Sequence, residues 1–360
     1  VTKIIIRNSN QSFEKNILIT IISSCFYSTD PFYSNCHYKK CVTNDSPAND
    51  TLSTTQNPNL LYSKEVSENA RINPQINSSV TTASSTSVEE YSCMCGKINS
   101  NNRIVGGTPV EKHLKYPWHV GLKSPSYSRK YYCAGSIINN LYVLSAAHCF
   151  YFRYCKFSIP NDLLIGIGDH NQVLTSDDID GVTIYARVET VLKHPKYDCN
   201  HHDYDFSLIK LKEPLTFDAN NGLRPVCLPE NSLNTYEGYI GTVMGWGLTS
   251  YYNGYQPDVL HEVNVPILGP TCDYKYGTSI TARMLCAEYP GGGKDACSGD
   301  SGGSISVAED RTYIQVGVVS WGYKCAKAGN PGVYSRVTSV LDWIKDSCSD
   351  GDWCPRRINL

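Results

Sequence analysis

Three short motifs in this sequence carry side chains suited to nucleophilic catalysis. Ser301 lies in a glycine-rich turn that begins at Gly299, His148 follows two alanines, and Asp205 lies in the motif 203–208. A serine hydroxyl is a weak nucleophile at neutral pH, so it needs a base and preorganised donors for the oxyanion that forms on the substrate. His148 can act as the base, Asp205 supplies a third member, and the glycine-rich turn around Ser301 can aim backbone N–H groups at one point. The motifs therefore predict acyl transfer by a serine nucleophile.

The elements that must position these residues are mostly short strands separated by turns. Residues 142–145 and 315–320 are good examples, and this pattern is typical of sandwiches and barrels. One helix is predicted at the C-terminal end, because apolar residues recur there with helical spacing. These residues are Val337, Val340, Leu341 and Ile344.

From Ile104 to about Ile344 the chain resembles the secreted trypsin-like serine endopeptidases of the chymotrypsin family. The order His, Asp, Ser is the one that these proteases use. The further motifs that carry the resemblance are Arg103-Ile104-Val105-Gly106-Gly107, Pro117-Trp118, Gly245-Trp246-Gly247, Ser320-Trp321-Gly322 and Gly329-Asn330-Pro331-Gly332-Val333-Tyr334. The resemblance implies an all-β fold of two six-stranded antiparallel β-barrels with a C-terminal helix. His148 and Asp205 would belong to the first barrel and Ser301 to the second. By resemblance, Asp205 would orient the imidazole of His148, and the backbone N–H groups of Gly299 and Ser301 would form the oxyanion hole.

The resemblance also implies a primary specificity pocket. Asp295 matches the position at its floor, and Gly322 and Gly332 match its walls. The residues expected to line it are Asp295, Ala296, Ser320, Trp321, Gly322 and Gly332. A buried carboxylate favours a cationic partner, so we expect cleavage of proteins or peptides after Arg or Lys. Arg should be preferred, because Ala296 stands where many relatives have a serine that helps to solvate an ammonium group.

Activation by proteolysis is a second implication. Cleavage after Arg103 would free the ammonium of Ile104, which in this family pairs with the aspartate before the nucleophile, here Asp300. We therefore interpret the chain as a zymogen that needs an upstream activating protease and meets protein inhibitors once it is active.

The 16 cysteines indicate an oxidising, extracellular compartment rather than thiol-bound metal. The resemblance implies bonds from Cys95 to Cys227, Cys133 to Cys149, Cys272 to Cys286 and Cys297 to Cys325. We add Cys155 with Cys199, because their loops are neighbours in this fold. Cys348 and Cys354 could close a small loop beyond the helix.

The N-terminal part of the chain differs in composition from the rest. Residues 1–42 form a cysteine-containing segment, 43–92 a disordered Ser/Thr/Asn-rich linker, 93–103 the activation segment and 104–360 the protease domain. The first segment is either a signal region or part of a disulfide-bonded module of the CUB type, and the second interpretation is favoured. Acceptor sequons at Asn10, Asn44, Asn49 and Asn77 indicate a glycoprotein.

The remaining charged residues predict no cofactor. The net charge of −2 gives no reason to expect nucleic acid or a membrane as partner. Asp169 and Asp178 lie where some relatives bind calcium, although a solvated acidic loop is favoured. His201, His202 and Asp203 are interpreted as residues that shape the substrate cleft rather than as metal ligands.

Two functions from different classes are consistent with these motifs. One is an active endopeptidase of limited proteolysis, as in clotting, immunity or venom action. The other is a catalytically silent binding protein on a protease scaffold. The complete set of His148, Asp205 and Ser301 favours the enzyme.

Overall fold

The structure is a computed structural model, and it describes residues 93–99, 108–110, 112–126, 128, 130–152, 155–218, 221–269 and 272–356. The segments 1–42 and 43–92 and the Arg103-Ile104 bond lie outside the described residues, so the expectations about them stay predictions. Among the described helices, none is long and apolar enough to cross a membrane.

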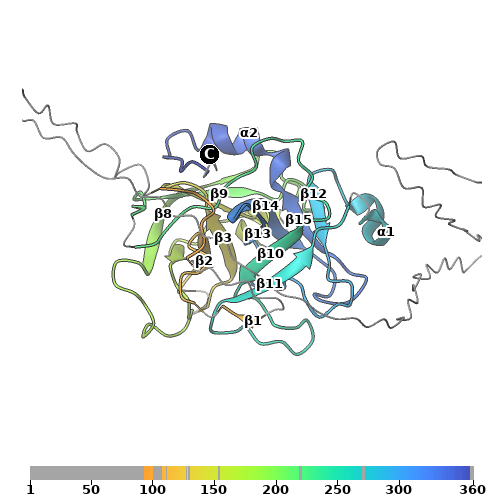
Figure 1. Cartoon of the computed structure of the whole chain (residues 1–360), viewed down its shortest axis with the longest axis horizontal. Coiled ribbons are helices and arrows are strands. Elements are labelled where there is room, and N and C mark those ends of the chain that lie inside the picture. Colours follow the sequence, from red (N-terminus) through yellow and green to blue (C-terminus); the bar gives the residue numbers. More distant parts are fainter. Residues whose placement is uncertain are drawn as a thin grey trace, which may run out of the picture. The chain divides into compact units, whose positions relative to one another are not determined.

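Six antiparallel strands close into a first barrel in the order β2-β3-β4-β9-β8-β7. The strands are β2 (His119–Lys123), β3 (Cys133–Ile137), β4 (Tyr142–Ser145), β7 (Leu164–Ile167), β8 (Ile184–Lys193) and β9 (Ser207–Leu211). β3 and β4 are buried along their whole length, whereas β8 alternates between half-buried and exposed residues as expected for a strand with one face in water. In Figure 1 these strands lie to the left of those of the second barrel.

A second antiparallel sheet has the order β1-β11-β10-β13-β14-β15-β12. Its strands are β1 (Thr108–Pro109), β10 (Ile240–Gly245), β11 (His261–Pro266), β12 (Met284–Ala287), β13 (Ser304–Glu309), β14 (Thr312–Trp321) and β15 (Gly332–Arg336). The sheet curls until its far strands meet, where Ile267 bridges Ala287 and the N–H of Leu268 donates to the carbonyl of Cys286 at 2.8 Å. The predicted double barrel is confirmed. A small hairpin of β5 (Tyr151–Phe152) and β6 (Lys156–Phe157) forms a separate sheet.

The C-terminal helix is also confirmed, with a tighter first turn than the spacing predicts. Val337–Ser339 is a 3₁₀ turn, and α2 follows it over Leu341–Ser347. All four residues of the apolar pattern are buried. The described residues also contain short elements that the sequence pattern did not predict: α1 (Asp273–Tyr276) and 3₁₀ turns at Ala147–Phe150 and Gly277–Ser279.

Candidate active site

The pairing of β4 with β9 brings His148 and Asp205 together. In this antiparallel pair Ser145 lies opposite Ser207, so the end of β4 and the start of β9 meet at one edge of the barrel. His148 lies in the 3₁₀ turn just after β4, and Asp205 lies just before β9. The Nδ1 atom of His148 is 2.7 Å from Oδ2 of Asp205, and the backbone N–H of His148 donates to Oδ1 at 2.8 Å.

Ser320 contributes a third hydrogen bond to the Asp205 carboxylate. Its hydroxyl donates to Oδ2 at 2.5 Å. Ser320 lies at a bulge of β14, where the pairing with β15 shifts register between Val319 and Trp321. A bulge re-aims the side chain at that position, and here it connects the second barrel to a carboxylate of the first.

The electrostatics of this pair suit a general base. Burial alone would raise the pKa of Asp205, but the charge and hydrogen bonds of His148, together with the Ser320 hydroxyl, hold that pKa below its ordinary value. Burial alone would likewise lower the pKa of His148, but the Asp205 charge and hydrogen bond outweigh it and raise that pKa. An ionised carboxylate can only accept, so Nδ1 carries the proton and the lone pair lies on Nε2.

Ser301 lies on the turn before β13 and is tied to the first barrel through its carbonyl. The N–H of Ala134 in β3 donates to this carbonyl at 2.7 Å. Cys149, the neighbour of His148, has its sulfur 3.7 Å from the same oxygen. The sequence motifs at His148 and Ser301, which are far apart along the chain, are therefore adjacent in the structure.

Two glycines with positive φ shape the turn around Ser301. Gly299 has φ +104° and Gly302 has φ +84°, values that favour glycine. A Cβ on Gly302 would also collide with the carbonyl oxygen of Ala134. The backbone N–H groups of Gly299 and Ser301 donate to no other described residue.

Ser301 shares a cavity of about 200 Å³ with the predicted specificity residues. Among the residues that line it are Asp295, Ala296, Ser320, Trp321, Gly322 and Gly332. A Cβ on Gly332 would come within 2.6 Å of Oδ1 of Asp295, so glycine is needed there. The structure thus gathers the residues of the predicted pocket around one cavity.

Asp295 is a largely buried carboxylate without a cation beside it among the described residues. It accepts hydrogen bonds from the backbone N–H groups of Ala296 at 2.8 Å and Ala326 at 3.0 Å. Burial raises its pKa to about 6, although these two donors oppose the shift. A cationic ligand would supply the missing charge.

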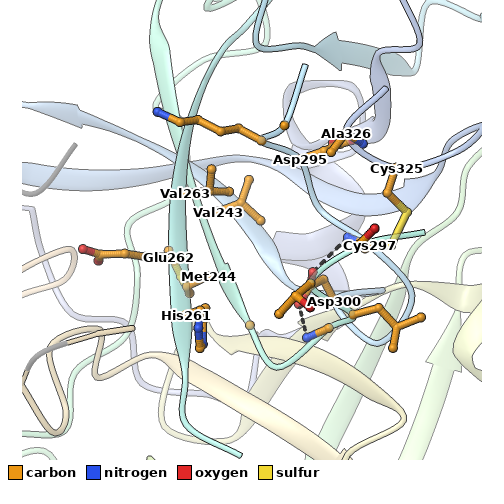
Figure 2. A pocket seen from close by; sticks show the side chains of 17 residues that line it. Val243, Met244, His261, Glu262, Val263, Asp295, Cys297, Asp300, Cys325 and Ala326 are labelled. Carbon is orange, nitrogen blue, oxygen red and sulfur yellow. Dashed lines mark hydrogen bonds between the residues drawn. A yellow bond between two sulfur atoms is a disulfide. The ribbon is translucent and has the colours of Figure 1, made fainter. Parts of the chain in front are cut away.

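Asp300 faces a different cavity of about 140 Å³ (Figure 2). Its carboxylate accepts from the N–H of Gly247 at 2.7 Å and of Cys297 at 2.9 Å. Burial raises the pKa of Asp300 to about 6, because these donors only partly replace lost hydration. No lysine or arginine among the described residues pairs with it.

Six disulfide bonds brace the described region. They join Cys93 to Cys354, Cys95 to Cys227, Cys133 to Cys149, Cys155 to Cys199, Cys272 to Cys286 and Cys297 to Cys325. The suggested Cys348–Cys354 loop is wrong, because Cys354 bonds to Cys93 of the activation segment. Cys348 is a buried thiol, and burial raises its pKa to about 12, which makes it unreactive.

The acidic and histidine residues of the two loops around Asp169 and Asp203 have different partners. Asp169 is buried and accepts hydrogen bonds from the hydroxyls of Tyr131 and Tyr185. Calcium binding by Asp169 and Asp178, the alternative that the sequence did not favour, stays untested. In the other loop, Asp203 pairs with Arg283 at 2.6 Å and His201 contacts Asp198 at 2.7 Å. His202 instead lies against His148.

Comparison with known proteins supports the interpretation drawn from this geometry. The family model of trypsin matches residues 104–344. The chain belongs to the trypsin family of serine proteases. Venom serine protease Bi-VSP of Bombus ignitus is 39% identical over 262 residues, which are 69% of this chain and 69% of that protein. A venom protease of Bombus pensylvanicus is 38% identical over 248 residues, 66% of this chain and 96% of that protein. Transmembrane protease serine 5 of Homo sapiens is 36% identical over 260 residues, 71% of this chain and 54% of that protein.

Several residues at this trypsin-family site were given no role in the sequence analysis. The hydroxyl of Tyr334 is buried beside Asp295 and has no hydrogen-bond partner within the described region. Arg283 and Thr281 hold Asp203 from the second barrel. Tyr334 is the last residue of the motif 329–334, so the sequence marked its position but not its role, whereas nothing in the local sequence marks Arg283.

Proposed function

We propose that this protein is a secreted serine endopeptidase, made as a zymogen, that cleaves after Arg and less well after Lys in limited proteolysis. The observation that carries the proposal is a continuous set of contacts that runs from Ser320 through Asp205 to His148, beside Ser301. Ser320 donates to Asp205, Asp205 holds Nδ1 of His148, and Ser301 lies beside that turn in the cavity that contains Asp295.

Each of these residues can then be assigned a step in peptide-bond hydrolysis. Ser301 would attack the scissile carbonyl while Nε2 of His148 takes its proton. Asp205 would stabilise the imidazolium, as its effect on the pKa of His148 indicates. The free N–H groups of Gly299 and Ser301 would hold the oxyanion, and loss of one such donor costs about 2.7–4 kcal/mol of transition-state stabilisation. The protonated His148 would finally donate to the leaving amine.

Substrate preference tests the proposal directly. We expect kcat/KM of the trypsin-activated protein to be highest for a P1-Arg substrate, lower for P1-Lys and very low for P1-Phe. A guanidinium can meet Asp295 with two parallel hydrogen bonds. An ammonium would need a further hydrogen-bond acceptor, and Ala296 has no hydroxyl to offer one. The measurement compares matched peptide amides that differ only at P1.

The matched variant for this comparison is Ala296→Ser. The added hydroxyl should raise the rate on Lys relative to Arg by about tenfold, the scale of one hydrogen bond to a charged group. A preference for Phe would overturn the pocket assignment. Equal rates on Arg and Lys in the wild type would refute the role given to Ala296.

The raised pKa of Asp295 predicts how cation binding depends on pH. An amidinium such as benzamidine binds the ionised carboxylate, so its affinity should fall as pH drops through about 6. One unit below that pKa, about a tenth of the carboxyl groups are ionised, and the affinity should be about tenfold lower. Calorimetry with Ser301→Ala protein measures this without turnover, and proton release on binding should accompany it. Equal affinity at about pH 5 and about pH 8 would contradict the assignment.

Zymogen activation is supported by the surroundings of Asp300. A buried carboxylate with a raised pKa, next to a cavity and without a lysine or arginine paired to it among the described residues, suits a new amine such as that of Ile104 (Figure 2). Secretion is supported by the disulfides and by the similarity to two venom proteases. An upstream protease that cleaves after Arg103, and protein inhibitors of the active form, are the partners we propose.

A further inference from the structure

His148 and His202 form a pair of imidazoles at the edge of the site. Their ring centroids are 5.8 Å apart and their planes are nearly perpendicular, at 86°. Nitrogen atoms of the two rings and a carboxylate oxygen of Asp205 all lie within 4.8 Å of one another. Two imidazoles this close are near the separation at which one ion can bridge them.

The hydrogen bonds of the two rings leave the same nitrogen available on each. Nδ1 of His148 bonds to Asp205 at 2.7 Å, and Nδ1 of His202 lies 3.4 Å from the hydroxyl of Tyr197. Neither Nε2 has a hydrogen bond to a described residue. Histidines that bind a metal usually engage their second nitrogen with a carboxylate or another oxygen, which fixes the tautomer and the ring orientation. Both rings already have such an oxygen partner.

The loop that carries His202 is held in one conformation. His202 has φ +54° and Tyr204 has φ +52°, so a non-glycine residue on each side of Asp203 is in the left-handed region. Such a conformation persists only where surrounding contacts fix it. Here Asp203 bonds to Arg283 at 2.6 Å and to Thr281 at 2.7 Å, and it bridges to Asp198. The position of His202 beside His148 is therefore preorganised.

We propose that Nε2 of His148 and Nε2 of His202 together bind a zinc ion, and that this ion inhibits the protease reversibly. Asp205 is not a ligand, because its oxygens already accept three hydrogen bonds. Water completes the coordination. Imidazole nitrogen suits zinc, whereas calcium and magnesium prefer oxygen ligands. Zn–N bonds of about 2.0–2.1 Å require the two nitrogens to lie about 3.3 Å apart, so zinc binding would move the half-buried His202 ring toward His148 while the backbone of its loop stays in place.

The inhibitory effect rests on the proposed function, whereas the binding of zinc does not. Nε2 of His148 has one lone pair. When that lone pair binds zinc, it cannot accept the proton of Ser301. The bound ion therefore removes the base and leaves the specificity cavity unchanged.

The activity test is a zinc titration of the activated enzyme with a P1-Arg substrate in buffer without chelator. We expect the rate to fall with added Zn²⁺, to return with excess EDTA, and to be unaffected by Ca²⁺ or Mg²⁺ at the same concentration. His202→Asn, which tolerates the left-handed backbone, should raise the half-inhibiting zinc concentration by at least about tenfold. The matched control is His201→Asn, because His201 is the exposed neighbour and its zinc response should equal that of wild type. Each variant is compared with its own zinc-free rate.

A binding test separates this proposal from the proposed function. Calorimetric titration of Zn²⁺ into Ser301→Ala protein should show a site that is lost in Ser301→Ala/His202→Asn and kept in Ser301→Ala/His201→Asn. Tyr197→Phe keeps both ligands and should weaken the site less than His202→Asn does, which separates ligand loss from a disturbed loop. Zinc binding that is equal in the His201 and His202 variants overturns the proposal. Absence of peptidase activity in wild type would refute the proposed function and leave the calorimetric result to decide the zinc site.

Discussion

Ser301→Ala is expected to abolish peptide hydrolysis by the activated protein, with kcat lowered by about 10⁶-fold. The variant removes the only atom that attacks the carbonyl and changes almost nothing else, because Ser301 lies on a half-exposed turn rather than in the core. The free energy of unfolding should change by no more than about 0.5 kcal/mol. Single-turnover and steady-state hydrolysis of a P1-Arg amide measure the loss, and denaturant unfolding measures the stability.

Benzamidine binding is the control for the integrity of the site. Ser301→Ala should bind benzamidine as wild type does, since Asp295 and the glycine walls of the cavity are untouched. Equal turnover by wild type and variant would refute Ser301 as the nucleophile. A fully cleaved wild-type protein that binds benzamidine and hydrolyses nothing would support the silent binding protein instead.

Arg103→Gln is expected to prevent activation. After exposure to trypsin the wild type should gain activity, whereas the variant should stay at least about 10²–10³-fold below it, the loss expected when the oxyanion donors are not held in place. The physical reason is Asp300, whose buried carboxyl has a pKa raised to about 6 and gains a counter-charge only when Ile104 becomes an N-terminus. Amidolysis before and after trypsin, with N-terminal sequencing of the product, measures both events.

Arg103→Lys is the matched control, because trypsin still cleaves after lysine. It should activate like wild type, which would show that the charge at residue 103 matters for cleavage and not for catalysis. If the uncleaved Arg103→Gln protein hydrolyses peptides as well as the cleaved wild type does, the zymogen proposal is wrong.

The sequence predicted short strands, the C-terminal helix and the catalytic motifs because their signals are local, whereas the double barrel and the specificity pocket were implied by the family resemblance. Apolar runs predicted β4 and β14, and the spacing of Val337 and Ile344 predicted the C-terminal helix. The motifs around His148 and Ser301 are each only a few residues long. Their adjacency, in contrast, depends on the register of β4 with β9 and on the contact between Ala134 and Ser301.

Contacts between distant segments could not be predicted in this way. Cys93 and Cys354 are 261 residues apart, and their pairing depends on where the C-terminal tail lies after α2. Arg283 reaches Asp203 from the opposite barrel. The bulge that turns Ser320 toward Asp205 has no sequence signal of its own, since the strand pattern continues through it.

The short segment 93–99 is attached to the catalytic body by two covalent bonds at different places. Cys95 is bonded to Cys227, and Cys93 is bonded to Cys354, while the N–H of Cys95 also donates to the carbonyl of Pro355. A single cut after Arg103 would therefore release no fragment, and on a non-reducing gel the two-chain form would migrate as one species. Reduction of either bond alone would still leave the part of the chain before the cut attached through the other bond. Residues 1–92, with any partner bound to them, would stay attached to the protease after activation. Their release would require a second cut before Cys93.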